Sequence, residues 1–476
     1  MTTRRTFLAG SSAALIAGAA PRLAWAKTEA DVAIIGAGLA GLNAARILEQ
    51  AGLKVVIVEA ENRVGGRLHT LDHLPGAPDA GGIQIGAGYA RLHAIADRLG
   101  VKRTTGPGSG AGRTQIPGNL YHLNGSSIAS SDWASSDWAS SEANTLPVEK
   151  RGIEPAMLAR SYFKYLPRLE TPADWLDTTS DQDISLRQML LQAGASAEEL
   201  RLIEVNLNGN SLAEMSQVHL ARTLAIFRAG AGPISTIVGG SQRLPQAMAA
   251  ELSAAPRLGE RVKAIVEEED AVTLRLSDYA IRAKHCICTI PFAALRNIAL
   301  ANDMTPAVAR MIGSLPYTRA SFAYITAKTP FWRADGLPDT LWTDDPVIGR
   351  VFVLSDGENG AQPMLKLWTT GSGADLLDRI PRESADRAII DRLEFMRPSA
   401  RRQLRVVEHY SWQKSASARG IYHHIGTGMV RDLATATQWE AKRLHFAGEH
   451  LAQSSSGMEG ALESGERIAN RVLKRS

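Results

Sequence analysis

Three glycines at fixed spacing, followed by a carboxylate, form the first pattern in this chain that can do chemistry. Gly36, Gly38 and Gly41 come directly after an apolar run and open a stretch with helical periodicity. The first glycine allows a tight turn, the second lets phosphates approach the backbone, and the third lets helix and strand pack closely. Glu59 ends a second apolar run, 18 residues after Gly41, where an acid can accept hydrogen bonds from a ribose. The pattern predicts a βαβ unit that binds a dinucleotide.

A second glycine-rich segment indicates which dinucleotide is bound. Gly65 and Gly66 lie between Arg63 and Arg67, and Asp-Ala-Gly-Gly follows at 79–82. Adjacent glycines allow close approach of the backbone, and the two guanidiniums can neutralise a pyrophosphate. These segments resemble the FAD-binding region of the flavin-containing amine oxidase family, which includes monoamine oxidases and L-amino-acid oxidases. Nicotinamide-dependent dehydrogenases do not ordinarily carry this extension.

The C-terminal part of the chain resembles the second half of the FAD site in the same family. Phe-Ala-Gly-Glu ends at Glu449, and a Met-Glu-Gly-Ala segment begins at Met458. The resemblance implies that Glu449 contacts the ribityl chain and that the backbone N–H of Met458 contacts the flavin O2. A helix N-terminus aimed at this edge stabilises the anionic reduced flavin. The resemblance also places Val262, on a strand expected at 259–265, against the adenine.

The resemblance implies a reaction as well as a cofactor. Family members take hydride from a C–H bond beside an amine nitrogen, water hydrolyses the imine, and oxygen reoxidises the flavin to give peroxide. Tyr422 matches one wall of the aromatic cage around the amine, whereas the second wall falls at Gly457, which has no side chain. Phe322 occupies the position where many members carry a lysine that holds a water near N5. Ile421 stands where some relatives bond the flavin through cysteine, so noncovalent FAD is expected.

Several functions remain open at this point. The favoured hypothesis is an FAD-dependent oxidase that acts on a small-molecule amine and uses O2. An L-amino-acid oxidase would require Arg91 to bind a carboxylate, although Arg91 is offset from the family's arginine position. Phe322 in place of the lysine favours a dehydrogenase or desaturase that uses another electron acceptor. A flavin-binding protein without turnover is the non-enzyme alternative.

The first 26 residues are typical of an export signal. Arg4 and Arg5 precede Thr-Phe-Leu, an apolar stretch follows, and a small-x-small sequence ends at Ala26. The apolar part is shorter than the ~20 residues that span a bilayer. The pattern resembles a twin-arginine signal, whose export machinery carries folded proteins. We therefore expect cleavage after Ala26, FAD acquired before export, a periplasmic or secreted protein, and no stable membrane anchor.

The charge composition gives no indication of a polyanionic partner. The chain of 476 residues has 53 basic and 49 acidic residues. Arg4, Arg5 and Arg22 lie in the signal, which has no acid, so the remaining chain has 50 basic residues against 49 acidic ones. This balance gives no reason to expect nucleic-acid binding.

The two cysteines, Cys286 and Cys288, are expected to be buried thiols, and no metal site is predicted. A homodimer remains open.

The order of the motifs predicts an α/β fold in which a Rossmann-like FAD-binding domain is interleaved with an α+β substrate-binding domain. After the signal peptide at 1–26, the FAD-binding domain comprises 27–95, 232–295 and 435–476, and the substrate-binding domain comprises 96–231 and 296–434. The stretch from 154 to 228 has helical periodicity. A repeated Ser-Ser-Asp-Trp-Ala at 130–139 suggests an exposed loop whose tryptophans pack, and glycines at 106–112 suggest another loop.

Overall fold

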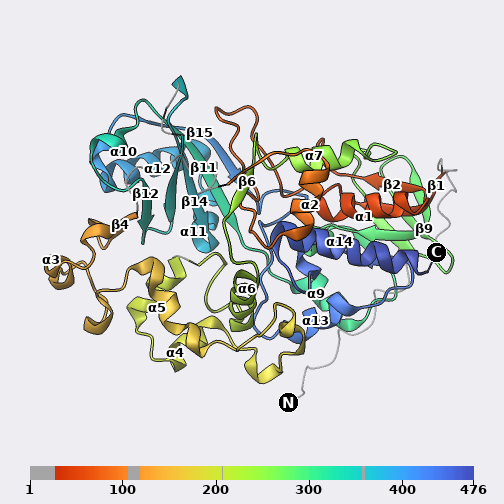
Figure 1. The fold of residues 1–476 in the computed structure, drawn as a ribbon, viewed down its shortest axis with the longest axis horizontal. Coiled ribbons are helices and arrows are strands. Elements are labelled where there is room, and N and C mark those ends of the chain that lie inside the picture. The colour runs from red at the N-terminus through yellow and green to blue at the C-terminus, as the bar shows by residue number, and fades with distance from the viewer. Residues whose placement is uncertain (1–26, 106–117, 206, 356, 358–359, 476) are drawn as a thin grey trace, which may run out of the picture.

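Two β-sheets lie towards opposite ends of the molecule, with helices covering and connecting them (Figure 1). The computed structural model describes residues 27–105, 118–205, 207–355, 357 and 360–475. The predicted signal peptide and the predicted loop at 106–112 lie outside these residues. The mixture of helices and sheets confirms the predicted α/β fold class.

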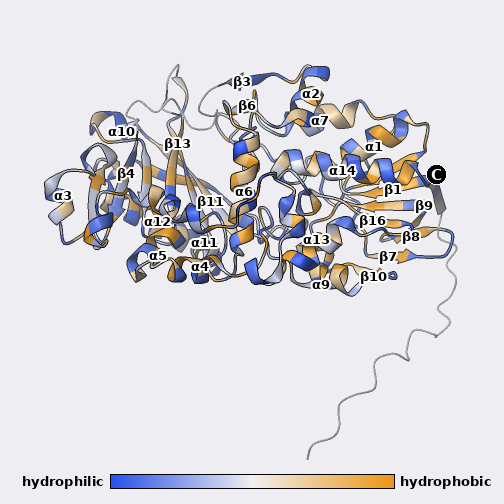
Figure 2. Ribbon diagram, turned by 60° about the horizontal axis from the view of Figure 1, so that its bottom comes forward, coloured by the Kyte–Doolittle hydropathy of each residue, from blue (hydrophilic) through white to orange (hydrophobic). Residues whose placement is uncertain are grey.

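The first sheet contains both strands of the predicted βαβ unit, which pair in parallel. Its strands are, in spatial order, β10 (Ala299–Ala301), β7 (Ala264–Glu267), β8 (Val272–Arg275), β9 (Ala280–Cys288), β1 (Lys27–Ile35) and β2 (Val55–Val58), with β16 (Leu444–Phe446) paired to β9. β8 pairs with the first half of β9 and β16 with its second half. The sheet therefore unites the beginning, middle and end of the chain, and its strands are strongly apolar (Figure 2).

Two helices from opposite ends of the chain, α1 (Leu39–Gln50) and α14 (Gly457–Leu473), lie side by side on this sheet (Figure 1). A Cβ atom at Gly465 would lie 2.3 Å from the carbonyl oxygen of Ala40. Only a residue without a side chain allows this approach of the two backbones. The contact brings the N-terminal ends of both helices to the same region of the molecule.

The second sheet separates an apolar core from a cavity. Its spatial order is β15 (Leu404–Ser411), β11 (Ala320–Ala327), β14 (Met364–Thr370), β13 (Arg350–Ser355), β12 (Thr340–Thr343), β4 (Asn119–Leu123) and β5 (Ser126–Ala129). All neighbours are antiparallel except β12 and β4. Side chains alternate between the faces, so Val351 and Val353 pack in a core beneath α12 (Arg382–Met396), whereas Phe352 and Leu354 line the cavity.

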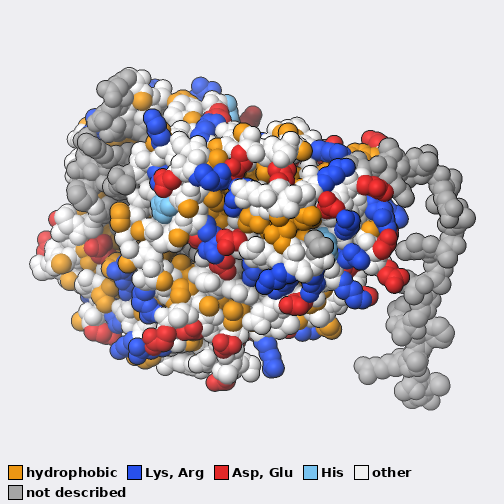
Figure 3. All heavy atoms as spheres, turned by 45° about the vertical axis from the view of Figure 1, so that its right-hand side comes forward, with side chains coloured by type: hydrophobic (Ala, Val, Ile, Leu, Met, Phe, Trp, Pro, Cys, Tyr) orange, Lys and Arg blue, Asp and Glu red, His pale blue; other side chains and the backbone are white. Residues whose placement is uncertain are grey.

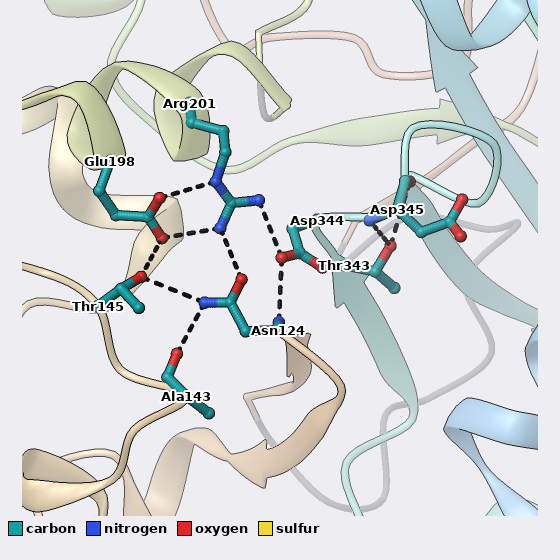
Figure 4. A network of polar contacts seen from close by, with 8 residues as sticks. All are labelled: Asn124, Ala143, Thr145, Glu198, Arg201, Thr343, Asp344 and Asp345. Atoms are coloured by element: carbon teal, nitrogen blue, oxygen red, sulfur yellow. Dashed lines mark hydrogen bonds and ion pairs between the residues drawn. The ribbon is translucent and has the colours of Figure 1, made fainter.

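Residues 154–228 are largely helical, as their periodicity predicted. This segment contains α4 (Leu186–Gln192), α5 (Ala197–Val205), α6 (Gln217–Ala229) and several 3-10 turns. A network of hydrogen bonds and ion pairs connects this helical segment to the second sheet (Figure 4). Arg201 on α5 forms ion pairs with Glu198 and with Asp344, which follows β12, and donates to Asn124 in the turn between β4 and β5.

The Ser-Ser-Asp-Trp-Ala repeat is exposed at its polar residues, as predicted, but it is not a loop throughout. Part of it forms the short helix α3 (Ser136–Ser140), and Trp133 and Trp138 are 2% and 5% exposed. Their ring centroids are 5.2 Å apart, and Trp133 also contacts Tyr121 on β4. Burial of the two indoles holds the repeat on the sheet, while the residues between them stay exposed to solvent. The predicted packing of both tryptophans is confirmed.

The remaining elements surround these layers. They are α2 (Ala90–Arg98), α7 (Arg243–Ala250), α8 (Phe292–Leu295), α9 (Pro306–Ser314), α10 (Phe331–Ala334), α11 (Gly371–Arg379), α13 (Val430–Gln438) and the paired strands β3 (Arg103–Thr105) and β6 (Ser235–Ile237). Both cysteines are buried free thiols, as expected. In the part of the chain that the structure describes, every helix is too short or too polar to cross a membrane. Basic and acidic side chains are mixed on the face shown in Figure 3.

Candidate active site

A cavity of about 930 Å³ extends between the two sheets. This volume is at the upper end of the ~300–1,000 Å³ typical of ligand pockets. Residues predicted from the sequence line it on the side of the first sheet: Gly36, Gly38, Glu59, Gly66, Arg67, Val262, Glu449, Gly457 and Met458. On the side of the second sheet it is lined by Arg350, Phe352, Leu354, Lys366, Trp368 and Tyr422. The cavity therefore joins the predicted cofactor residues to the predicted reaction centre.

The turn between β1 and α1 has the geometry that its glycines require. Gly36 has a φ of +105°, and a Cβ atom there would lie 2.5 Å from Oγ1 of Thr289. Gly38 is the N-cap of α1 and has open space where a Cβ would be, so a ligand can approach its backbone. A Cβ at Gly41 would lie 2.1 Å from the carbonyl oxygen of Gly36, so this glycine allows helix packing and does not line the cavity.

Glu59 holds the turn and faces the cavity. Its carboxylate accepts hydrogen bonds from the backbone N–H groups of Ala37 at 2.8 Å and Glu61 at 2.9 Å. Burial raises the pKa of Glu59, which these hydrogen bonds partly oppose. The side chain is therefore oriented at the end of β2, where a bound ribose can donate to it.

The two predicted arginines have different surroundings. Arg63 donates to the carbonyl oxygens of Leu68 at 3.1 Å and Gly66 at 2.8 Å, and it is absent from the cavity lining. Its guanidinium therefore shapes the glycine loop. Arg67 lines the cavity and pairs with Glu449, with 2.8 Å between Nη1 and Oε1.

Glu449 is a buried anion held by two partners. In addition to Arg67, Nδ1 of His423 lies 2.6 Å from Oε2 of the carboxylate. Burial by itself would raise the pKa of Glu449, but the charges of His423 and Arg67 hold it well below its usual value. The site thus presents a fixed carboxylate that can accept hydrogen bonds from ligand hydroxyls.

The N-terminus of α14 opens on the cavity. Gly457 begins the helix with a φ of +55°, and Met458 follows it in the lining. Glu459 is anchored by Arg91, at 3.3 Å between Oε1 and Nη1, and Arg91 also pairs with Glu466 at 2.7 Å. Arg91 therefore positions α14 and is outside the cavity lining. Its pKa is raised although burial opposes the effect, because both carboxylates stabilise its charge.

Val262 and Tyr422 line opposite parts of the cavity. Val262 lies just before β7, so the strand predicted at 259–265 begins later than expected, at Ala264. Tyr422 is on the substrate side, and burial raises its pKa to about 12. The phenol is therefore neutral at physiological pH and presents an uncharged ring to the cavity.

Phe322 lies beneath the cavity wall, and the lysine next to it comes from the neighbouring strand. Phe322 on β11 pairs with Trp368 on β14, and the two ring centroids are 4.5 Å apart. Lys366, two residues before Trp368, lines the cavity with its Nζ 4.3 Å from the centroid of the Phe322 ring. The structure therefore places an amine beside the position where the sequence analysis found none.

Lys366 is buried, and within the described part of the chain it has no acidic partner at hydrogen-bond distance. Its Nζ donates to the carbonyl oxygen of Asp79 at 2.8 Å, and the side chain is 2% exposed. Burial lowers its pKa to about 7, although the charge of Asp79 opposes the shift. An amine with such a pKa can take up or release a proton near neutral pH.

The loop that contains Asp79 links the two sheets. The carbonyl oxygen of Asp79 accepts a hydrogen bond from the hydroxyl of Tyr324 at 2.9 Å as well as from Lys366. The carbonyl oxygen of Ala80 accepts one from Nε1 of Trp412 at 2.6 Å. A Cβ at Gly81 would lie 1.9 Å from the carbonyl oxygen of Arg67. These contacts fix the position of Lys366 relative to the glycine loop that is predicted to hold the cofactor.

Comparison with known proteins decides the family. The model of the flavin containing amine oxidoreductase family matches residues 39–473. The chain belongs to this family. An amine oxidase [flavin-containing] from Danio rerio is 24% identical over 93% of this chain and 85% of its own length. A flavin-dependent L-tryptophan oxidase from Lentzea aerocolonigenes is 24% identical over 91% of this chain and 96% of its own.

Solved structures share the fold of this family member. Cyclohexylamine oxidase from Brevibacterium oxydans superposes with a TM-score of 0.75 and 23% identity, covering 94% of this chain and 99% of that one. Putrescine oxidase bound to putrescine superposes with a TM-score of 0.73 and 21% identity, and the match covers 94% of this chain and 100% of that one. The protein is accordingly an FAD-dependent amine oxidoreductase.

The cavity fits FAD by the chemistry of its lining. Glycines leave room for a pyrophosphate at the N-terminus of α1, whose N–H groups favour an anion. Glu59 and Glu449 are placed to accept from hydroxyl groups, and the N-terminus of α14 faces the same cavity. These donors and acceptors match the phosphates, ribose and ribityl chain of the dinucleotide.

The sequence did not reveal Lys366 or Arg350 as cavity residues. Both lie in strands whose pairing joins segments with no local motif, and an isolated basic residue in an apolar strand is their only signal in the sequence. Charged residues rarely occupy the buried face of a strand, so that pattern could have identified them.

Proposed function

We propose that this protein oxidises the C–N bond of a small-molecule amine. The observation that carries the proposal is the continuous cavity from the FAD-binding turn at Gly38 to Tyr422 and Lys366. When bound, FAD supplies the acceptor for hydride from the carbon beside the amine nitrogen, and water hydrolyses the resulting imine. The protein contributes orientation, exclusion of water and proton transfer.

Lys366 is suited to deprotonate the substrate. An amine must lose its ammonium proton before the adjacent C–H bond can be oxidised. Nζ of Lys366 is a neutral base above pH 7 because its pKa is about 7. The π face of Tyr422 orients the amine, and its neutral hydroxyl avoids trapping the substrate as an ion pair.

Oxygen is the proposed electron acceptor, and H2O2 the proposed product. Because Phe322 replaces the lysine of many family members, the alternative of another electron acceptor stays open. The amine of Lys366 places a basic group close to Phe322 and so favours oxygen. Anaerobic addition of amine to the purified holoprotein should bleach the flavin spectrum, and admission of air should restore it with one peroxide per turnover. Bleaching that air does not reverse would show a dehydrogenase, and no bleaching by any amine would reject the proposed activity.

FAD is proposed to be bound noncovalently. Ile421 lines the cavity where the family resemblance places the flavin-bonding cysteine of some relatives, and both cysteines of the chain are buried in the first sheet. Denaturation with acid should release all flavin into the supernatant. Flavin that stays with the precipitated protein would contradict this proposal.

Export by the twin-arginine route is proposed from the sequence at 1–26. The expected location is the periplasm or the medium, with FAD bound before export. Replacing Arg4 and Arg5 together by lysine should leave the protein inside the cell at its full mass. The matched variant Arg22→Lys should be exported normally. Equal export of both variants would contradict the proposal.

A further inference from the structure

The guanidinium of Arg350 lines the cavity on the side of the second sheet. Arg350 begins β13 on the face shared by Phe352 and Leu354, and it is half-buried. Among the described residues, no carboxylate lies within ion-pair distance of Arg350. Its Nη2 donates to the amide oxygen of Asn208, which also lines the cavity.

The electrostatic state of Arg350 agrees with this geometry. Burial lowers its pKa, and the only charge that opposes the shift is that of the Tyr422 hydroxyl. Two other basic groups of the cavity lining are in a different state, since Arg67 pairs with Glu449 and Lys366, with a pKa of about 7, is only partly protonated near neutral pH. A partly buried guanidinium without a counter-ion is less favourable than a paired one, and a bound anion would compensate it.

The surroundings of Arg350 fit a carboxylate. The planar guanidinium can donate two parallel hydrogen bonds to one carboxylate. Asn208 accepts from Arg350 through its oxygen, so its amide N–H groups remain to donate. Cζ of Arg350 lies 5.9 Å from the centroid of the Trp368 ring, and Nζ of Lys366 lies 5.3 Å from the same centroid. An anion site and a base thus flank one aromatic wall.

We propose that Arg350 and Asn208 bind a carboxylate of the substrate, and that the substrate is therefore an amino acid. This inference rests on the proposed oxidation of an amine and specifies its substrate class. The carboxylate binds at Arg350 while the amine lies against Tyr422 and Lys366. The role is distinct from that predicted for Arg91, which is engaged by Glu459 and Glu466 outside the cavity.

The first test measures binding without turnover. Wild-type holoprotein is titrated with 3-phenylpropanoate and with its uncharged amide, and the flavin spectrum and heat of binding are recorded. The acid should bind much more tightly than the amide. Arg350→Met should weaken binding of the acid by about 100-fold, as expected for loss of a buried charge partner, and Arg350→Lys should weaken it less. Arg405→Met, which removes an exposed arginine from β15, should bind like the wild type.

The second test compares amino acids with the amines that lack only the carboxylate. Arg350→Met should raise KM for amino acids by about 100-fold with little change in kcat, while the matched amines keep the kcat/KM of the wild type. The proposal would be overturned if the wild type bound the acid and the amide equally, or if Arg350→Met lost the same factor in kcat/KM for both substrate classes. Loss of FAD from Arg350→Met would also overturn it. Wild-type protein that binds the acid through Arg350 but oxidises neither class would reject the proposed function and leave the anion site standing.

Discussion

Lys366 and Phe322 show how two neighbouring positions can divide one role. Phe322 occupies the strand position where the family resemblance leads one to expect a lysine, and its ring supports the Nζ of Lys366 at 4.3 Å. The amine comes from β14 and the supporting surface from β11. The amine of Lys366 lines the cavity beside the buried ring of Phe322, and we propose that it supplies the basic group of the site.

The first prediction concerns the pH dependence of this lysine. Burial lowers the pKa of Lys366 to about 7, so its neutral form is populated above that pH and the protonated form below it. Flavin reduction by substrate should therefore accelerate as the pH rises through about 7. In the Lys366→Met variant, the rate of single-turnover flavin reduction should no longer rise with pH in this range. An unchanged rise in the variant would assign the titration to another group.

The same lysine predicts an effect on stability. The folded-state pKa lies below the ~10.4 of an unfolded lysine, so the unfolded chain binds more protons between these values. The cost of burying Lys366 is therefore full below pH 7 and declines as the pH rises towards 10.4. Lys366→Met should raise the melting temperature more at pH 6 than at pH 9. A larger gain at pH 9 would contradict the assigned direction.

A third residue-scale prediction concerns the buried anion. Glu449→Gln would leave Arg67 and His423 without their carboxylate, and removing one member of a buried pair costs about 3–5 kcal/mol. We expect weaker FAD binding and a lower free energy of unfolding, measured by flavin titration and denaturant unfolding. Glu466→Gln, which affects the more exposed pair with Arg91, should change both by less than about 1 kcal/mol. Equal effects of the two variants would contradict the role given to Glu449.

At the scale of elements, the crossing of α1 and α14 sets the position of both helix N-termini at the cavity. Gly465 permits this crossing because a Cβ there would lie 2.3 Å from the backbone of Ala40. The loop at 79–82 connects the two sheets, because its carbonyl oxygens accept hydrogen bonds from Tyr324, Lys366 and Trp412. The cofactor end and the substrate end of the cavity are thus held in register by backbone contacts.

The helix crossing can be tested with alanine. Gly465→Ala should lower the free energy of unfolding by about 1–3 kcal/mol, because the added methyl group forces the helices apart. Gly313→Ala in α9 is the matched control, since a Cβ there has nothing within 4 Å. The control should be neutral or stabilising by up to about 1 kcal/mol. Thermal and denaturant unfolding of both variants measure the difference, and equal stabilities would exclude a tight crossing.

Local motifs and long-range pairings differed in how well the sequence predicted them. Gly36, Gly38 and Glu59 belong to one continuous βαβ unit, so their spacing was sufficient to place them together. Lys366 and Arg350 reach the cavity only through pairing of β14 with β11 and β13, and no local signal gives that register. The packing of the two tryptophans in the repeat and the exposure of the residues between them were both predicted, whereas the short helix α3 was not.

At the scale of the molecule, the cavity depends on parts of the chain that are far apart in sequence. The first sheet combines β1, β9 and β16, and the opposite wall comes from β13 and β14. FAD lying along this cavity would contact the beginning, middle and end of the chain. Binding of the cofactor is therefore coupled to the stability of the whole fold.

Removal of FAD gives the prediction at this scale. A ligand that binds only the folded state stabilises it by about 2.7 kcal/mol at 100 times its dissociation constant. The apoprotein should melt at a lower temperature than the holoprotein, and added FAD should restore the melting temperature in a concentration-dependent way. Riboflavin, which lacks the pyrophosphate and adenosine, should restore it much less. Equal effects of FAD and riboflavin would contradict the position assigned to the pyrophosphate at α1.

The central claim is that this protein transfers hydrogen from the carbon beside an amine nitrogen to bound FAD. The most direct measurement is the anaerobic rate of flavin bleaching with an amino acid substrate and with the same substrate deuterated at that carbon. We predict complete bleaching in both cases and a slower rate with the deuterated compound, because cleavage of this C–H bond is part of the reduction. Absence of bleaching across amines and amino acids, or equal rates when reduction itself limits bleaching, would contradict the claim.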